Sequence, residues 1–224
     1  MRTIQVGPYP LQVRLLSHDD FQGILQLQEK VYRSLAQPEH LQQLTEEEID
    51  VILTQQLFAG AFNEEKLVAA RAFLRPVNDP EHLAKDVGIP EDEWEHVIYS
   101  EITVVDPDFQ GYGLQKKLGE WWLERLVESD VSYICTTVAP FNIASMKDKF
   151  HLGMKIAALK HKYNGKLRYV FVKNLHRSSQ CLEETRKVPM IETAKQQQLL
   201  AEGFLGTAIK EEQGVWWVHY TLVE

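Results

Sequence analysis

The feature that most constrains the fold is a strand that leads through two glycines into a helix. Residues 96–105, HVIYSEITVV, are rich in β-branched and aromatic side chains, which favour a strand. Asp106-Pro107 ends that strand, because proline has no backbone N–H to donate to a ladder. After Gln110-Gly111-Tyr112-Gly113, apolar residues recur at helical spacing to about residue 128. The order strand, loop, helix predicts an α/β architecture.

The rest of the chain continues this alternation. Capping boxes that begin at Ser17 and Thr45 predict two helices, and apolar runs on either side of residues 63–66 predict a hairpin. Another strand and a short helix follow the glycine-loop helix, and Asn164-Gly165 predicts the turn of a second hairpin.

We expect two parts. Residues 1–175 are predicted to form one domain with a mixed central sheet flanked by helices. Residues 176–191 are polar and predict a linker, after which a helical pattern and the strand VWWVHYTLV predict a small α+β extension. The second part is therefore 176–224, a linker plus a C-terminal helix-strand extension. No internal repeat is evident in the sequence.

Composition argues against several classes of function. Hydrophobic residues make up 44% and charged residues 25% of the chain, as in ordinary soluble proteins. A net charge of −8 without a basic tract argues against nucleic-acid binding. No apolar run has the length of a signal peptide or a membrane span, so no membrane association is expected. With only Cys135 and Cys181, we expect reduced thiols and a cytoplasmic location.

The glycine loop suits an anion, because a helix start has unpaired N–H groups and glycine has no Cβ to shield them. A Walker loop needs Gly-Lys followed by Ser or Thr, which is missing here. A dinucleotide fingerprint that starts at Gly111 and Gly113 needs a small third residue, where this chain has Lys116. Both nucleotide patterns therefore fail, and the alternative to an anion site is a plain tight turn.

The surrounding residues fit a third pattern. Val105-Asp-Pro107, followed by Gln110-Gly111-Tyr112-Gly113-Leu114-Gln115, resembles motif A of the GNAT acyltransferase superfamily, whose members transfer an acyl group from coenzyme A, usually to an amine. Further along, Asn142, Ser145 and Gly153-Met154 resemble motif B of the same superfamily. The resemblance covers roughly residues 12–175.

This resemblance implies a GNAT-like acyl-CoA N-acyltransferase fold with acetyl-CoA as the acyl donor. It implies that backbone groups of the strand end bind pantetheine, that the glycine loop binds the pyrophosphate, and that the motif-B helix start contacts the coenzyme. The implied coenzyme-binding residues are Val104, Val105, Gln110, Gly111, Tyr112, Gly113, Leu114, Gln115, Asn142 and Ser145. Two residues depart from the superfamily pattern, since Gln115 replaces a Gly or Ala and Lys149 replaces a frequent tyrosine.

Attack on a thioester needs a neutral amine, and a lysine-like amine has a pKa of about 10.4, so a base must remove its proton. The resemblance implies that Glu101 is this base, and burial in its apolar strand would raise its pKa toward a useful value. The alternative is an acid on the solvent side. Lys149 could donate a proton or a positive charge, or could simply be solvated. The predicted catalytic residues are thus Glu101 and Lys149, and no metal site is predicted.

We therefore expect an N-acetyltransferase that moves acetyl from acetyl-CoA directly to an amine. The sequence does not identify that amine, which is either a small molecule or a peptide. A second interpretation is a GNAT-like module that binds acyl-CoA without turnover, since Gln115 and Lys149 depart from the pattern. A third possibility is a homodimer in which the C-terminal strand completes a partner's sheet.

Overall fold

The computed structural model describes residues 2–35, 41–177 and 181–223. The chain forms two compact units: unit 1 is Met1–Arg75 with Tyr99–Glu128, and unit 2 is Pro76–Ile98 with Ser129–Glu224. Strand β5 (Val97–Val105) begins in unit 2 and ends in unit 1. The boundary expected at residue 175 stays a prediction.

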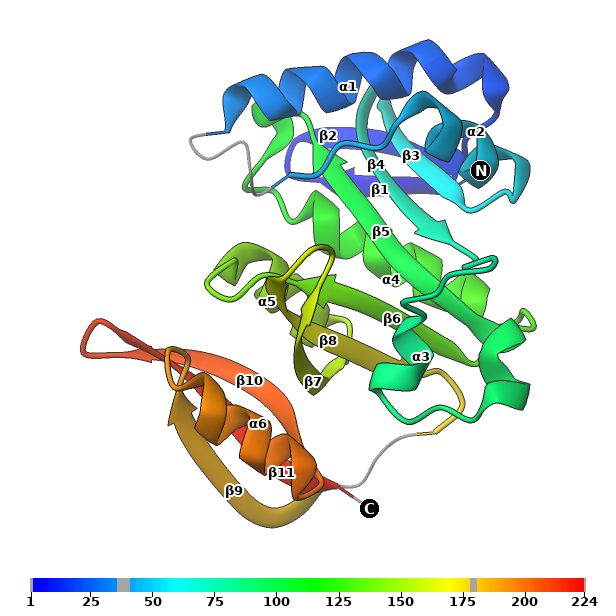
Figure 1. Cartoon of the computed structure of the whole chain (residues 1–224). Helices are drawn as coiled ribbons and strands as arrows, with labels where there is room; N and C mark the ends of the chain where they lie inside the picture. Colours follow the sequence, from blue (N-terminus) through cyan, green and yellow to red (C-terminus); the bar gives the residue numbers. More distant parts are fainter. Residues whose placement is uncertain (1, 36–40, 178–180, 224) are drawn as a thin grey trace. The chain divides into compact units, whose positions relative to one another are not determined.

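Unit 1 contains five strands that pair antiparallel with their neighbours. In sheet order they are β1 (Arg2–Val6), β2 (Tyr9–Leu15), β3 (Phe58–Asn63), β4 (Lys66–Leu74) and β5. Its helical elements are η1 (His18–Asp20), α1 (Phe21–Ser34), α2 (Glu46–Thr54), η4 (Pro107–Phe109) and α4 (Leu114–Leu126). In Figure 1, α1 and α2 lie on the near side of these strands, whereas α4 passes behind β5.

Local sequence explains where these helices begin. The hydroxyl of Thr45 accepts a hydrogen bond from the Glu48 N–H at 3.2 Å, and the Glu48 carboxylate accepts one from the Thr45 N–H at 2.8 Å. This predicted capping box is therefore present. Apolar side chains of α4, among them Leu118 and Trp122, are buried in the core of unit 1 with Phe58 and Phe73. The ring of Trp122 packs edge-on against Phe73 with 5.2 Å between centroids.

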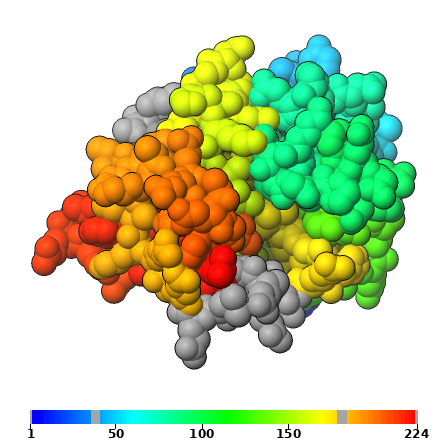
Figure 2. Space-filling model, turned by 60° about the horizontal axis from the view of Figure 1, so that its bottom comes forward, coloured from blue at the N-terminus to red at the C-terminus, as the bar shows by residue number. Residues whose placement is uncertain are grey.

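Unit 2 contains the remaining six strands, and the pairs between them are also antiparallel. In sheet order they are β6 (Tyr133–Val138), β8 (Lys166–Asn174), β7 (Lys155–Lys162), β10 (Phe204–Glu212), β11 (Val215–Val223) and β9 (Cys181–Pro189). Its helical elements are α3 (Leu83–Asp86), η3 (Glu91–His96), α5 (Ile143–His151) and α6 (Thr193–Ala201). In Figure 2 the surface of residues 181–201, in orange, continues into that of the β7–β8 hairpin, in yellow.

Four strands differ from the sequence-based expectation. The linker predicted over 176–191 is wrong for 181–189, which form the edge strand β9 paired with β11. An edge strand needs no continuous apolar run, so its polar composition gave a misleading signal. The strand β10 was also missed, and so was the β1–β2 hairpin, whose two prolines obscure the strand pattern.

In the part of the chain that the structure describes, no helix is long and apolar enough to cross a membrane.

Candidate functional site

The end of β5 is fixed by a buried carboxylate. Asp106 is fully buried, and one of its oxygens accepts a hydrogen bond from the Asp108 N–H at 3.1 Å, which caps η4. Its carboxylate also pairs with the ammonium groups of Lys30 at 2.6 Å and Lys66 at 2.9 Å. Burial alone would raise the pKa of Asp106, but the hydrogen bonds from both lysines outweigh it and hold the pKa below its usual value. These contacts therefore hold the backbone that follows β5 in place.

The glycine loop itself presents bare backbone. Gly111 and Gly113 adopt φ angles of +82° and +73°, in the left-handed region that favours glycine. A Cβ built on either residue would meet nothing within 4 Å, so the space beside both is open. The Gln110 side chain turns back and donates to the Val105 carbonyl at 3.2 Å. That bond links the end of β5 to the glycine loop. The resemblance to motif A implies that these two segments belong to one site.

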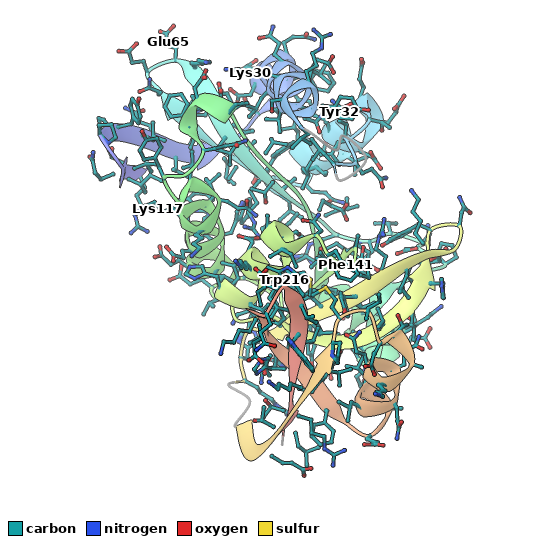
Figure 3. All side chains as sticks on the ribbon, turned by 90° about the vertical axis from the view of Figure 1, so that its left-hand side faces the viewer. Lys30, Tyr32, Glu65, Lys117, Phe141 and Trp216 are labelled. Carbon is teal, nitrogen blue, oxygen red and sulfur yellow. The ribbon has the colours of Figure 1, made fainter. Side chains whose placement is uncertain are left out.

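The start of α4 lacks the usual protein partners for its N–H groups. Its N-cap is Gly113, no side chain caps it, and its first turn contains no acid. Lys116 and Lys117 lie there instead, and Lys117 is labelled in Figure 3. Two cations beside the positive end of a helix dipole are unfavourable unless an anion binds nearby.

An aromatic group supports this loop from the β1–β2 turn. The Tyr112 ring lies so close to Gly7 that a Cβ on Gly7 would be 2.5 Å from Cδ1 of the ring. Tyr9 packs against Tyr112 with 5.9 Å between centroids and against Phe109 at 4.9 Å. Sequence reasoning missed Gly7 and Tyr9, because their contacts with the loop span about a hundred residues of chain.

A buried arginine lies under the first turn of α4. Arg71 of β4 is fully buried, and its guanidinium donates to the Gln115 carbonyl and to the Ser100 hydroxyl, both at 3.4 Å. The available signal was an arginine inside the apolar run LVAARAFL. This bond is made to the backbone of Gln115, so it does not depend on the size of that side chain.

Glu101 differs from the sequence expectation in its surroundings. It lies on β5, but its side chain is exposed, whereas its neighbours Ser100 and Ile102 are buried. The β4–β5 register also shifts between the pairs Arg71–Thr103 and Phe73–Ser100, and Glu101 falls within this shift. The expectation that Glu101 is buried in its strand is therefore wrong, and the alternative of an acid on the solvent side agrees with its exposure. Whether Glu101 is the base stays a prediction.

The motif-B residues lie in unit 2. The Asn142 side chain caps α5 by accepting from the Ser145 N–H at 3.2 Å. Lys149 is not solvated: it is 6% exposed, and its ammonium pairs with Asp148 at 3.3 Å. Phe141, just before the cap, is 52% exposed and has a φ of +66°, an unusual conformation for an aromatic residue.

Cys135 is fully buried and is poorly suited to act as a nucleophile. Burial raises the pKa of its thiol to about 12, with a smaller contribution from Asp86, so the thiolate is negligible near neutral pH.

Comparison with solved structures identifies the fold. An acetyltransferase of the GNAT family from Listeria monocytogenes matches with a TM-score of 0.60 at 19% identity, covering 77% of this chain and 99% of that chain. The ribosomal-protein-S18-alanine N-acetyltransferase from Escherichia coli matches at 0.55 and 16%, covering 78% and 99%. The PaiA N-acetyltransferase from Thermoplasma acidophilum, solved in complex with coenzyme A, matches at 0.54 and 10%, covering 73% and 98%.

A scan of protein-family profiles gives no match to this sequence, and a sequence search of curated proteins gives none either. The predicted α/β fold of the GNAT type is confirmed by the structural matches.

Proposed function

We propose that this chain is an acyl-CoA-dependent N-acyltransferase, and in the simplest case an N-acetyltransferase that moves acetyl from acetyl-CoA to an amine. The single observation that carries the proposal is the start of α4, where two glycines at positive φ precede a helix with no side-chain cap and no first-turn acid. The structural matches to GNAT acetyltransferases support it.

The residues present fit the pyrophosphate of coenzyme A. Open space at the Cβ positions of Gly111 and Gly113 lets an anion approach the backbone N–H groups. Under this proposal the loop from Gln110 to Gln115 holds the pyrophosphate, and backbone groups of Val104 and Val105 bind the pantetheine arm. In unit 2, the proposed coenzyme contacts are Asn142 and Ser145.

The proposed reaction is a direct transfer. Glu101 takes a proton from the acceptor ammonium, directly or through water, and the neutral amine nitrogen attacks the thioester carbonyl. A C–N bond forms, the C–S bond breaks, and the electron pair leaves on the coenzyme A sulfur. The nitrogen loses a second proton to give the amide, and the thiolate takes up one proton to give the thiol, so the protons balance. Exposure suits Glu101 to passing its proton on to water. The proposed role of Lys149 is a positive charge that stabilises the thiolate, held by its pair with Asp148.

The test is mass spectrometry of acyl transfer after incubation of the protein with acetyl-CoA and a panel of small-molecule and peptide amines. We expect a mass gain of one acetyl group on at least one amine. Glu101→Gln should lower kcat/KM by about 10²-fold to 10⁴-fold, since it removes a general base, while the Kd for coenzyme A stays unchanged.

The binding-module interpretation makes the opposite prediction. Coenzyme A would then bind tightly with no transfer to any amine, and Glu101→Gln would have no effect. A cytoplasmic location also remains part of this proposal and is tested by fractionation of the native source.

A further inference from the structure

The C-terminal segment repeats the second half of the acyltransferase fold. The first copy is β6, α5, β7 and β8, residues 133–174, and the second copy is β9, α6, β10 and β11, residues 181–223. Both helices have nine residues, and α6 begins at 193 and ends at 201 where α5 begins at 143 and ends at 151. No such repeat is evident from residue identities alone.

Backbone detail agrees at both ends of the two helices. The N-cap residues Asn142 and Glu192 have φ and ψ of −75° and 71° and of −84° and 68°. These values belong to an inverse γ-turn, which is uncommon at a helix start, and each copy has the matching bond: Ile143 N–H to Phe141 O at 2.8 Å and Thr193 N–H to Ile191 O at 3.0 Å. After the helices, Gly153 and Gly203 both have positive φ, +74° and +91°.

Strand register agrees as well. Val138 pairs with Tyr169 in the first copy, and Val188 pairs with Val218 in the second. These pairs are equivalent because the turn of the second hairpin is one residue shorter than that of the first. The hairpins share an irregularity, since β7 shifts register against β8 between Ile156 and Ala158, and β10 shifts against β11 between Gly206 and Ala208. Coincidence of helix length, cap geometry, register and bulge position in one fold is the pattern of a duplicated unit.

The two copies meet edge to edge with local two-fold symmetry. Strand β10 pairs antiparallel with β7, and the paired residues are Gly206 and Ile156, which are equivalent positions of the two copies. The strand order β6-β8-β7-β10-β11-β9 is accordingly symmetric about this seam. Helix contacts are reciprocal, because α5 packs against β10 and α6 against β7. The Phe141 N–H of the first copy donates to the Met190 sulfur at 3.2 Å, and the Met190 N–H donates to the Trp216 carbonyl at 2.8 Å; Phe141 and Trp216 are labelled in Figure 3.

Specific contacts hold the copies together. The Gln196 side-chain oxygen accepts from the Tyr169 hydroxyl of the first copy at 2.7 Å and from the Tyr220 hydroxyl of the second at 2.9 Å. Gln197 donates to the Leu159 carbonyl of β7 at 2.9 Å. Position 206 has no room for a side chain, since a Cβ on Gly206 would be 2.8 Å from Cβ of Ile156. A buried polar network whose members are paired makes the packing around it more rigid.

The second copy carries charged residues at the positions equivalent to Asn142 and Ser145. Glu192 replaces Asn142 and makes no side-chain cap, and Lys195 replaces Ser145. Its outer strand β9 carries Glu184, Arg186, Lys187 and Pro189, all of which discourage pairing with a further strand. The second copy therefore pairs with β7 on one side and presents a strand that pairs poorly, β9, on the other.

We propose that residues 181–223 are a duplicated half-domain that takes the place of a second subunit on the β7 edge, so that each chain closes this edge by itself. The partner that fits the β7 surface is the chain's own C-terminal copy, not a second chain. This inference does not depend on the proposed activity.

Hydrogen exchange at two protein concentrations tests the pairing in the full chain. We expect β7 amides to be equally protected in dilute and concentrated solution, because the strand that covers them, β10, belongs to the same chain. Protection of β7 that falls as the protein is diluted would show that a second chain covers this edge and would overturn the proposal.

A substitution at the seam gives a second measurement. Gly206→Val should drive the second copy off β7 and raise the exchange rates of β7 amides at least ten-fold. Ile156→Gly in the same chain should reverse much of this rise, because it removes the Ile156 side-chain atoms that a side chain at position 206 would meet. If Gly206→Val prevents folding, wild-type exchange still decides: β7 amides that exchange as fast as those of an exposed edge strand would contradict the proposal.

Discussion

At the scale of single residues, some groups of the candidate site could be predicted from the sequence and others could not. The open backbone at Gly111 and Gly113 could be predicted, because the two glycines and the helix that follows them are adjacent in sequence. Arg71, Gly7 and Tyr9 could not, because their contacts with the loop are made by tertiary packing between distant segments. Glu101 shows the limit of periodicity: its place on β5 was correct, but exposure depends on what covers the strand.

The open backbone of the loop can be tested by a matched pair of substitutions. Gly111→Ala and Gly165→Ala both put a Cβ on a residue at positive φ, +82° and +88°, with open space around it. Each should therefore cost about 1 kcal/mol of stability through backbone strain alone. Only Gly111→Ala should also weaken coenzyme A binding, by about ten-fold in calorimetry, equivalent to ~1.4 kcal/mol. Equal affinities for the two variants would argue against the loop as the pyrophosphate site.

The buried Asp106 predicts a pH dependence of stability. Its folded-state pKa is below the unfolded value, so its stabilising effect is complete above an unfolded pKa of about 3.9 and is lost as pH falls through the folded pKa. Asp106→Asn should lower the free energy of unfolding by about 2 kcal/mol at pH 7, since a buried charge-assisted network is lost. That difference from the wild type should shrink in urea titrations below about pH 4.

Asp108→Asn is the control for this measurement. Asp108 also pairs with Lys30, at 2.7 Å, but its side chain is 69% exposed. It should change stability by less than about 1 kcal/mol at any pH. A larger effect of Asp108→Asn than of Asp106→Asn would show that burial is not what makes Asp106 important.

At the scale of elements, helices were predicted more reliably than strands. Capping boxes and apolar periodicity identify a helix from adjacent residues, and α1, α2, α4 and α5 all occur where expected. Strands take their stability from partners elsewhere in the chain, so the polar edge strand β9 and the proline-containing β1–β2 hairpin carried too little local signal.

The β1–β2 turn is predicted to shape the glycine loop. Gly7→Ala would place a methyl group against the Tyr112 ring and displace it, so coenzyme A should bind several-fold more weakly while the sheet stays folded. In a double-mutant cycle, Gly7→Ala should have little further effect once Tyr112→Ala has removed the ring. Additive losses of affinity would mean that the turn acts on the loop by some other route.

The network around Gln196 is predicted to be essential for attaching the second copy. Gln196→Met, which introduces the residue found at the equivalent position 146, leaves two buried tyrosine hydroxyls without this acceptor. The free energy of unfolding should fall by about 2 to 4 kcal/mol in denaturant titrations. Adding Tyr169→Phe and Tyr220→Phe should restore most of that loss, because no buried hydroxyl is then left unpaired.

At the scale of the whole molecule, the chain combines one complete set of predicted coenzyme residues with a partial duplicate. The glycine loop has no counterpart in residues 181–223, and the duplicate carries Glu192 and Lys195 in place of Asn142 and Ser145. The sequence could not show this relationship, because backbone geometry and register were kept while most side chains changed.

One coenzyme A per chain is therefore expected in calorimetry. A stoichiometry of two would mean that the duplicate has kept a site of its own. A Glu192→Asn, Lys195→Ser variant should still bind one equivalent, because the two residues alone do not supply a glycine loop at a helix start.

The two equivalent hairpins also create a hazard while the chain folds. Neighbouring segments with the same register can exchange partners, as tandem repeats do when they misassemble. The seam discriminates against such exchange, because Gly206 fits against Ile156 whereas two isoleucines at these places would collide. Because the two copies differ at this position, each hairpin pairs poorly in place of the other. The pairing of Gly206 with Ile156 is therefore favoured over the alternatives.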